Sequence, residues 1–389
     1  MSEVNCLACG SDQVTKFLRL DQVPVFCNVL WETAAEAKAA PCGDLDLGIC
    51  SDCGHVFNVG FDPELVRYAE GYENSLHHSP RFQQYAEELA ADLQSRHELT
   101  EAHVVEIACG QGDFLKLVCS SPKSTGSGFD PSFRGEPIAD NITIYGEYFG
   151  VRPMERQADL VCCRHALEHI DEPAPFLKSV RAGLPADSKC VLFFEMPNSL
   201  YSLRDGGVWD FIYEHVSYFC ATSLIACFER AGLRVSRTWE TFAGQFLCIE
   251  AHADGSSGSP IDASPVPSGA ELTTLATGLS QQLADLLEEW KSAFQKVRQA
   301  GGKVAIWGAG SKGVTFLNLM GEEADICIPV DINPQKRGLH VPGTGHKVVA
   351  PAELTGKNIQ LVLVMNPIYA TEIAGMVSEL GIEAKVVGV

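Results

Sequence analysis

The sequence of 389 residues is short of positive charge, because 29 Lys and Arg residues stand against 50 Asp and Glu residues. The formal net charge of −21 repels phosphate backbones and anionic lipid surfaces. It therefore argues against general nucleic-acid or membrane binding, and an anionic ligand would need a local site that overcomes this field. The hydrophobic fraction of 46% and the charged fraction of 20% are typical of a globular protein.

Long apolar runs are also missing, since none approaches the roughly 20 residues that cross a bilayer. The first residues, MSEVNCLACGSD, contain no basic stretch leading into an apolar one, so we expect no secretory signal. Cysteine is not scarce: there are 15, many of them in apolar runs such as LVCC at 160–163. In a chain of this size without a signal, this usage favours reduced thiols and a cytoplasmic location.

Four cysteines differ from the rest because they form two C-x-x-C pairs, CLAC with Cys6 and Cys9 and CSDC with Cys50 and Cys53. Each pair can place two thiolates on one cation, and two pairs complete a tetrahedral Zn²⁺ site. With four protein ligands and no open position, this zinc would be structural. The alternative is four unligated thiols. We expect the nearby Cys42 and His55 to take no part.

The length predicts two or three domains. Ser79 and Pro80, followed by apolar residues at helical spacing, predict a helix that leads into the middle of the chain. Short apolar runs then alternate with helical or turn segments, which predicts an α/β fold with a doubly wound, mostly parallel sheet. A Gly-, Ser- and Pro-rich stretch at 253–269 predicts a linker, and an amphipathic helix follows at roughly 270–300.

The last ninety or so residues contain four strand signals, which predict a small Rossmann-like α/β unit. The domain organisation that we predict is a zinc-binding module at 1–72, a doubly wound domain at 73–252, a linker and long helix at 253–300, and a C-terminal domain at 301–389.

The first glycine-rich turn reads Glu106-Ile-Ala-Cys-Gly110-Gln-Gly112, and Asp130 ends the next strand signal. Glycines let the backbone approach a ligand closely, and an acid after the second strand can hold the two hydroxyls of a ribose. No third glycine follows, which favours a nucleoside without phosphates over a dinucleotide. Arg164 and His165 follow a later strand signal and are expected at the same ligand-binding edge of the sheet.

These segments resemble those of the class I S-adenosylmethionine (SAM) methyltransferases, over roughly residues 100–250. The resemblance implies SAM as the cofactor. The cofactor-binding residues that we predict are Glu106, Gly110, Gly112, Asp130, Arg164 and His165.

The second glycine-rich turn, Gly308-Ala-Gly310-Ser-Lys-Gly313, fits G-x-G-x-x-G, and Asp331 follows about 20 residues later. Alone, it indicates a dinucleotide site and an NAD-dependent oxidoreductase. It could instead be a tight structural turn. In a third interpretation, its helix N-terminus binds the diphosphate of a substrate, with Lys312 and Arg337 adding positive charge.

The whole chain resembles the SAM-dependent sugar C-methyltransferases, which methylate nucleotide-linked 4-keto deoxysugars in natural-product biosynthesis. The resemblance includes EHVSYF at 214–219 and the C-terminal WGAGSKG…VDINPQKRGLHVPGT pattern. It implies that His215 is a base and that the last domain helps to bind the nucleotide sugar. The substrate-binding residues that we predict are Tyr218, Gly308, Gly310, Lys312, Asp331 and Arg337.

Where the family usually has Tyr-His before Glu-His, this chain has Ile212 and Tyr213. The domain plan therefore carries over, while substrate identity does not. An upstream tyrosine of the family has its counterpart in GYENSLHHSP, where we choose Tyr72. The catalytic candidates are accordingly His215, Glu214, Tyr213 and Tyr72.

A carbon next to a ketone needs proton abstraction before methylation, and the intrinsic pKa of histidine suits a base near neutral pH. Glu214 could orient His215 or bind a substrate hydroxyl, and Tyr213 or Tyr218 could donate to an enolate oxygen. Two alternatives remain: a His with only a structural role, and SAM-dependent methylation of oxygen or nitrogen in another small metabolite. We expect a monomer or homodimer.

Overall fold

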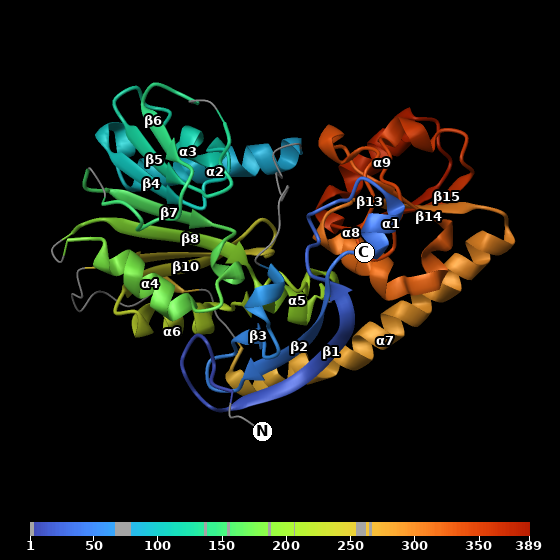
Figure 1. Cartoon of the computed structure of the whole chain (residues 1–389), viewed down its shortest axis with the longest axis horizontal. Coiled ribbons are helices and arrows are strands. Elements are labelled where there is room, and N and C mark those ends of the chain that lie inside the picture. Colours follow the sequence, from blue (N-terminus) through green and yellow to red (C-terminus); the bar gives the residue numbers. More distant parts are fainter. Residues whose placement is uncertain are drawn as a thin grey trace.

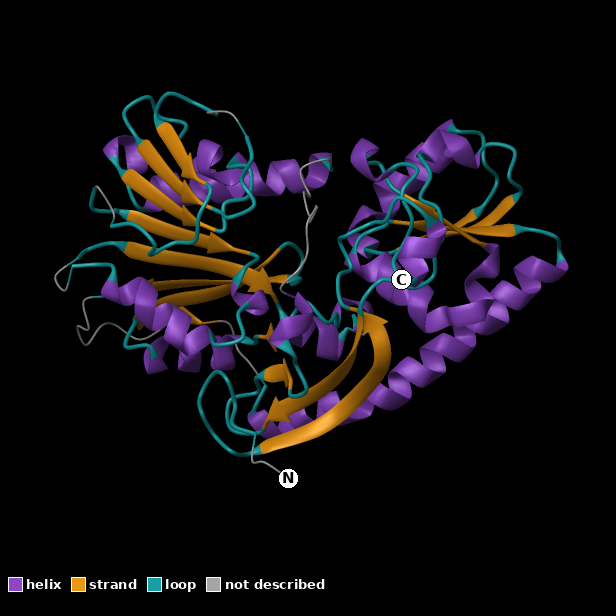
Figure 2. Ribbon diagram, in the orientation of Figure 1, coloured by secondary structure: helices purple, strands orange, loops and turns teal. Residues whose placement is uncertain are grey.

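The computed structural model describes residues 4–66, 79–135, 138–153, 156–185, 188–205, 207–253, 262–263 and 267–389. Within these residues the strands form three sheets, and Figures 1 and 2 show them as separate lobes joined by helices and loops. Tyr72 and the predicted boundary between 72 and 73 lie outside the described residues. The domain boundaries therefore stay predictions.

The N-terminal sheet has the strand order β1-β2-β3-β9 and takes its last strand from the middle of the chain. Its bounds are β1 Val14–Pro24, β2 Cys42–Cys50, β3 Val56–Asn58 and β9 Ser217–Tyr218, with helix α1 at Ala34–Lys38. β9 pairs with β3 in antiparallel register, Val56 opposite Tyr218 and Phe57 opposite Ser217. The Glu-His stretch thus lies beside the N-terminal sheet, which the sequence did not lead us to expect.

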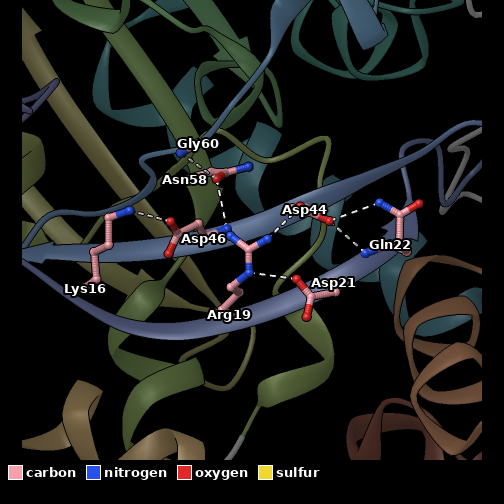
Figure 3. A network of polar contacts seen from close by, with 8 residues as sticks. All are labelled: Lys16, Arg19, Asp21, Gln22, Asp44, Asp46, Asn58 and Gly60. Carbon is pink, nitrogen blue, oxygen red and sulfur yellow. Dashed lines mark hydrogen bonds and ion pairs between the residues drawn. The ribbon is translucent and has the colours of Figure 1, made fainter. Parts of the chain in front are cut away.

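One face of β1 and β2 carries charged side chains (Figure 3). Lys16 Nζ lies 2.5 Å from Asp46 Oδ2, and Arg19 lies 2.6 Å from Asp44. The side chain of Asn58 accepts a hydrogen bond from the backbone N–H of Asp46 and ties β3 to β2. Exposed ion pairs of this kind contribute about 0–1 kcal/mol each. The buried leucines on the opposite face, such as Leu45 and Leu47, therefore hold the sheet.

The middle sheet has the order β12-β10-β11-β8-β7-β4-β5-β6. β4 to β8 are parallel neighbours, and β11 is antiparallel to both β8 and β10. Its strands are β4 His103–Ile107, β5 Thr125–Phe129, β6 Ile142–Tyr145, β7 Leu160–Arg164, β8 Val191–Pro197, β10 Arg234–Thr241, β11 Phe246–His252 and β12 Asp262–Ala263. The doubly wound, mostly parallel sheet predicted from the sequence is confirmed.

Helices cover both faces of this sheet, because alternate residues of each buried strand point to opposite sides. In β7, Leu160 and Cys162 belong to the core under α2 and α3, whereas Val161 and Cys163 belong to the core under α4 and α6. The helices are α2 Pro80–Arg96, α3 Asp113–Val118, α4 Pro173–Ala182, α5 Ser199–Arg204 and α6 Ala221–Arg230. Ser79 caps α2, as predicted: its hydroxyl accepts from the N–H of Phe82.

The C-terminal sheet is parallel, in the order β14-β13-β15-β16. Its elements are β13 Lys303–Trp307, β14 Cys327–Val330, β15 Ile359–Val364 and β16 Lys385–Gly388, with helices α7 Gly269–Gln299, α8 Ser311–Met320 and α9 Ala370–Glu379. The predicted long helix and the small α/β unit are both confirmed. No helix in the described part of the chain is long and apolar enough to span a bilayer.

One apolar cluster connects the N-terminal and C-terminal lobes through α5 and α7. It contains Leu47 of β2, Phe211 ahead of β9, and Phe316 of α8, with buried residues of α7 such as Leu279. Figure 1 shows α7 running from the N-terminal sheet to the C-terminal sheet, and Ser280 of α7 donates to the carbonyl of Phe17 at 2.6 Å. The C-terminal unit is therefore packed into the rest of the molecule.

We predict that Gly313→Ala destabilises the protein, because a Cβ at Gly313 would lie 2.0 Å from the carbonyl oxygen of Gly308. Overpacking of this kind costs about 1–3 kcal/mol. The matched control is Gly375→Ala on the exposed face of α9, where a Cβ meets nothing within 4 Å. That change should stabilise by about 0.5–1 kcal/mol. Thermal unfolding checks both, and equal melting temperatures for the two variants would contradict the prediction.

Candidate active site and metal centre

The first glycine turn connects β4 to α3 at the carboxyl edge of the middle sheet. Its backbone is left-handed at Ala108, Gly110 and Gly112, with φ of 55°, 55° and 86°. A side chain added at Gly110 would meet no described atom within 4 Å, whereas one at Gly112 would lie 2.5 Å from Ile144. The turn therefore packs closely at Gly112 and leaves open space at Gly110, where a ligand can approach the backbone.

Asp130 follows β5 and braces this turn. Its Oδ2 accepts from the N–H of Gly110 at 2.8 Å, and its Oδ1 accepts from the N–H and the hydroxyl of Ser132 at 2.8 and 2.6 Å. An ionised carboxylate has about four acceptor positions. The contacts among described residues therefore leave about one position for a ligand hydroxyl, and holding two hydroxyls would require the hydroxyl of Ser132 to turn away.

Glu106 lies within β4, below the turn. It is buried, and its Oε2 has no hydrogen-bond partner among the described residues. Burial raises the pKa of Glu106 to about 8, although Arg164 acts in the opposite direction. A buried carboxyl oxygen without a partner is consistent with a ligand that completes its hydrogen bonds.

Arg164 and His165 end β7, and both lie next to Glu195 of β8. Arg164 Nε donates to Glu195 at 2.8 Å, and His165 Nε2 lies 3.0 Å from the other carboxylate oxygen. Burial alone would raise the pKa of Glu195, but Arg164 and His165 hold it at about 2. The guanidinium of Arg164 also stacks over Phe114, at 4.0 Å from its ring centre. This ion cluster fixes the shape of the cofactor edge.

The predicted tyrosine donors are both bonded to backbone groups. The Tyr213 hydroxyl accepts from the N–H of Asp62 at 2.9 Å, and its ring lies against Gly43 of β2. The Tyr218 hydroxyl accepts from the N–H of Ile212 and donates to the carbonyl of the same residue, both at 2.8 Å. In this conformation both hydroxyls hold the loop in place.

Glu214 connects the same loop to the N-terminal module. Its Oε2 accepts from the N–H of Cys27 at 2.8 Å, and the backbone of Asn28 is a second donor to the carboxylate. Burial raises the pKa of Glu214 to about 7. Within the described residues no hydrogen bond or ion pair joins its carboxylate to His215, so the expected partner of His215 is oriented toward another segment.

His215 lies beside Glu168 and His169, which belong to the 3₁₀ turn Leu167–His169. One carboxylate oxygen of Glu168 and one ring nitrogen of each histidine all lie within 4.8 Å of one another. The rings of His169 and His215 are nearly perpendicular, with centroids 4.8 Å apart, and His169 Nδ1 lies 3.0 Å from the carbonyl oxygen of Glu214. His215 Nδ1 and Glu168 Oε2 are buried and lack hydrogen-bond partners in the described part of the chain.

Burial controls the charge of this trio. It lowers the pKa of His215 well below its usual range, with further lowering by His169, His165 and Lys312, and it lowers the pKa of His169 to about 4. Burial also raises the pKa of Glu168 to about 7. Both imidazoles are therefore neutral near neutral pH, and a neutral imidazole can accept a proton.

The second glycine turn lies close to this loop. A Cβ at Gly310 would lie 3.8 Å from Asn28 Oδ1, and Asn28 binds Glu214 through its backbone. Lys312 Nζ lies 2.5 Å from Asp210, which precedes the Glu-His stretch. Residues 27–28 thus lie between the second glycine turn and the Glu-His stretch, and they contact both.

The charges around the second turn are mostly paired. Arg337 Nε donates to Glu353 at 2.8 Å, and Asp331 accepts from the N–H of Ala309 at 3.0 Å. Lys336 is a positive group close to Gly310, since its Nζ would lie 3.8 Å from a Cβ at that position. This Nζ donates to the carbonyl of Ala309 and lies 3.4 Å from Asp331. Sequence reasoning missed Lys336, although its position in the NPQKR run beside Arg337 was a signal.

The four predicted zinc ligands come together at the end of β2. Sγ of Cys6 lies 3.6 Å from that of Cys53, the same distance separates Cys9 and Cys50, and all four sulfurs lie within 4.8 Å of one another. A tetrahedral zinc with bonds of about 2.3 Å separates its sulfurs by about 3.8 Å, so the cluster fits this ion. Arg230 of α6 donates to the carbonyls of Leu7 and Ala8 and holds the first pair against the middle domain.

The N-terminal module has two further side chains of metal-binding type, Cys42 and His55. Cys42 begins β2, at the far end from Cys50, and His55 is buried between the rings of Phe57 and Phe219. Neither belongs to the group of four sulfurs that lie within 4.8 Å of one another.

A cavity of about 280 Å³ lies along one face of β4, β5 and β6, from His103 and Thr125 at their amino ends to Phe129 and Tyr145 at their carboxyl ends, and neither the first glycine turn nor His215 lines it. Ligands of doubly wound sheets bind at the carboxyl ends of the strands. We therefore place the candidate site at the glycine turn and His215, and not in this cavity.

Comparison with known proteins gives two domain matches. Residues 77–238 match a family model described as a methyltransferase domain, and residues 269–383 match one described as a C-methyltransferase C-terminal domain. A search of the curated proteins finds no match. The two matched stretches contain the first and second glycine turns respectively.

Solved structures resemble only part of the chain. A SAM-dependent methyltransferase from Clostridium acetobutylicum ATCC 824 is 12% identical, with a TM-score of 0.33 over 43% of this chain and 90% of that chain. One from Aquifex aeolicus is 15% identical, with a TM-score of 0.33 and coverage of 42% and 88%. The DhpI–SAH complex is 21% identical, with a TM-score of 0.33 and coverage of 44% and 86%.

Proposed function

We propose that this SAM-dependent methyltransferase, whose middle sheet has the class I methyltransferase fold, methylates a carbon next to the ketone of a nucleotide-linked deoxysugar. The observation that carries the proposal is His215, a buried and neutral imidazole whose Nδ1 has no partner among the described residues. It lies where the N-terminal loop, the middle domain and the second glycine turn meet. The match of residues 269–383 to a C-methyltransferase domain supports carbon as the acceptor.

SAM is assigned to the first glycine turn. The residues present fit it, because Gly110 leaves open space, Glu106 has an unpartnered buried oxygen, and Asp130 keeps about one acceptor position. When bound, SAM supplies an electrophilic methyl group on a sulfonium. Arg164 and His165 complete this edge through Glu195.

In this proposal His215 takes the proton from the carbon next to the ketone. The C–H bond electrons would remain on the substrate as an enolate, whose carbon would accept the methyl group that bound SAM supplies, with S-adenosylhomocysteine as the leaving group. The tyrosine hydroxyls that we expected to oppose the enolate charge are bonded to backbone in this conformation. Lys312 is a positive group near enough to lower the pKa of His215. We assign to Lys312 the task of opposing the negative charge of the enolate.

The nucleotide part of the substrate is assigned to the second glycine turn. The diphosphate binds at the N-terminal end of α8, at Gly308 and Gly310, where helix N–H groups favour anions. Lys336 adds positive charge beside the turn, and Asp331 and Arg337 lie around it. An NAD-dependent oxidoreductase, which this turn alone would allow, is favoured by no observation of the site.

A structural zinc is assigned to Cys6, Cys9, Cys50 and Cys53, and we predict that one equivalent co-purifies. Cys50→Ser should lose the metal and lower the melting temperature, because losing one thiolate weakens a closed site and local folding together. Cys42→Ser is the control, since Cys42 lies outside the cluster. Elemental analysis of freshly purified protein checks this, and a preparation without zinc would overturn it.

Asp130→Ala should weaken SAM binding by about 1.5–3 kcal/mol, roughly 10- to 150-fold in Kd, because it removes a charge-assisted hydrogen bond to the ribose and the acceptor that holds the N–H of Gly110. Asp331→Ala is the matched control: it should leave SAM affinity near wild type and weaken binding of thymidine or uridine diphosphate. Titration calorimetry with both probes gives the answer. Unchanged SAM affinity in Asp130→Ala would mean that the ribose lies elsewhere.

His215→Asn should lower kcat about 100-fold or more, the loss typical of a missing general base, while SAM affinity changes little. The probes are nucleoside-diphosphate 4-keto-6-deoxysugars. With S-adenosylhomocysteine in place of SAM, the wild type should exchange the proton next to the ketone with deuterated water, and the variant should not.

Wild-type rates and exchange in His215→Asn would show that His215 is structural. Methylation that proceeds without any wild-type exchange would shift the interpretation toward an oxygen or nitrogen acceptor, although a shielded base can return its own proton.

A further inference from the structure

Two buried glutamates flank the histidines of the candidate site, and their surroundings differ. Glu214 is next to His215 in the sequence, but its carboxylate accepts N–H groups from the loop at Cys27 and Asn28. Glu168 lies 47 positions before His215 in the sequence. One of its carboxylate oxygens is within 4.8 Å of a ring nitrogen of both His169 and His215.

The hydrogen bonds of Glu168 are incomplete. Its side chain is 3% exposed, its Oε1 lies 3.9 Å from His165 Nδ1, and its Oε2 has no partner among the described residues. A buried carboxylate oxygen without a donor is costly and calls for an explanation. A cation that exists only during the reaction would provide one.

A protonated His215 is that cation. Burial disfavours an imidazolium, so a buried histidine that takes a proton needs a nearby negative charge. Glu214 cannot serve well from its present position, because its charge is already directed at two backbone N–H groups. Glu168 is within reach and has acceptor capacity left.

We propose that Glu168, and not Glu214, is the carboxylate that stabilises His215 while His215 carries the substrate proton. This rests on the proposed function, in which His215 is the base. Both glutamates act through other groups and are positioning residues with separate tasks: Glu168 opposes the charge of the imidazolium, and Glu214 holds the loop at Cys27. After methyl transfer the proton passes from His215 to solvent, and Glu168 is unchanged over the cycle.

The charge of Glu168 depends on several neighbours. Its pKa is raised to about 7 by burial, so the carboxylate is ionised above this value and loses its charge as the pH falls through it. The support for His215 should fade over the same range. The titratable and charged groups that face the pair are His165 at the end of β7, His169 on the 3₁₀ turn, Glu195 on β8, Glu214 on the loop and Lys312 on α8.

The first test compares Glu168→Gln with Glu214→Gln in the full-length protein. Methylation of nucleoside-diphosphate 4-keto-6-deoxysugars is followed against pH, and SAM calorimetry confirms that each variant is folded. Glu168→Gln should lower kcat about tenfold or more with little change in KM. In the wild type the rate should fall at acid pH as Glu168 is protonated, and this fall should be absent in Glu168→Gln. Glu214→Gln should keep the wild-type pH profile, whatever rate is lost through a looser loop.

The second test needs no substrate. Ring ¹⁵N resonances of His215, assigned by their loss in His215→Asn, are followed against pH in protein labelled at histidine. The wild type should show an inflection from the ionisation of Glu168. The inflection should disappear in Glu168→Gln and persist in Glu214→Gln. The reverse pattern, or an unchanged inflection in both variants, would overturn the proposal.

The two proposals fail in different ways. If His215→Asn methylates at the wild-type rate, the base is misassigned. If His215→Asn is inactive while Glu168→Gln keeps the wild-type rate and pH profile, only the role of Glu168 is wrong. For Glu214, rescue by Gln but not by Leu supports the loop-holding task, because the amide oxygen of Gln can still accept the N–H of Cys27. Loss of activity in Gln and Leu alike, with the pH profile changed, contradicts it.

Discussion

The pairing of β9 with β3 determines where the candidate base lies. Two residues of the central Glu-His stretch complete the N-terminal sheet, and the N–H of Asn58 donates to the carbonyl of Val216 at 2.9 Å. Glu214 and Tyr213 add side-chain bonds to Cys27 and Asp62. The stretch has little regular structure of its own, so these contacts across domains give it a defined conformation. The cysteine cluster at the end of β2 lies next to this pair of strands, because Ile49, which precedes Cys50, is opposite Val56 in the sheet.

Burial determines the protonation states of the side chains around His215, and it does so without a strong ion pair among the described residues. It lowers the pKa of both histidines, so their imidazoles are neutral near pH 7, and it raises the pKa of Glu168 and of Glu214 to about 7, so these two carboxyl groups change charge near that pH. A site in this state is ready to receive a proton and has a carboxyl group that can ionise beside it. At the cofactor edge, by contrast, Arg164 and Glu195 are permanently charged and paired.

Local patterns predicted the regular part of the fold well. Strands β4 to β8, the capped start of α2, helix α7 and both glycine turns follow from hydrophobic spacing and backbone requirements within a few residues. The four cysteines were also predicted, because two C-x-x-C pairs carry their geometry with them. The antiparallel pair β10 and β11 and the curved N-terminal sheet gave weaker signals and were not predicted as such.

The contacts that decide the chemistry were beyond local reasoning. Glu214 meets Cys27 across 187 positions and Tyr213 meets Asp62 across 151, and only the folded chain brings such residues together. Sequence adjacency made Glu214 look like the partner of His215, whereas the structure places Glu168 beside it. Lys336 was missed for the same reason, since its role depends on the turn that it faces.

Helix α7 has a consequence for how the sequence can change. Its 31 residues span about 46 Å as a rigid rod. At its start, a Cβ on Gly269 would lie 1.9 Å from the carbonyl of Ser51, and near its end Arg298 pairs with Glu323 and Asp325. Inserting one residue in the middle would rotate one end against the other by about 100° and lengthen the rod by 1.5 Å. The helix can therefore tolerate many substitutions on its exposed side, but its length sets the distance between the cysteine cluster and the C-terminal sheet.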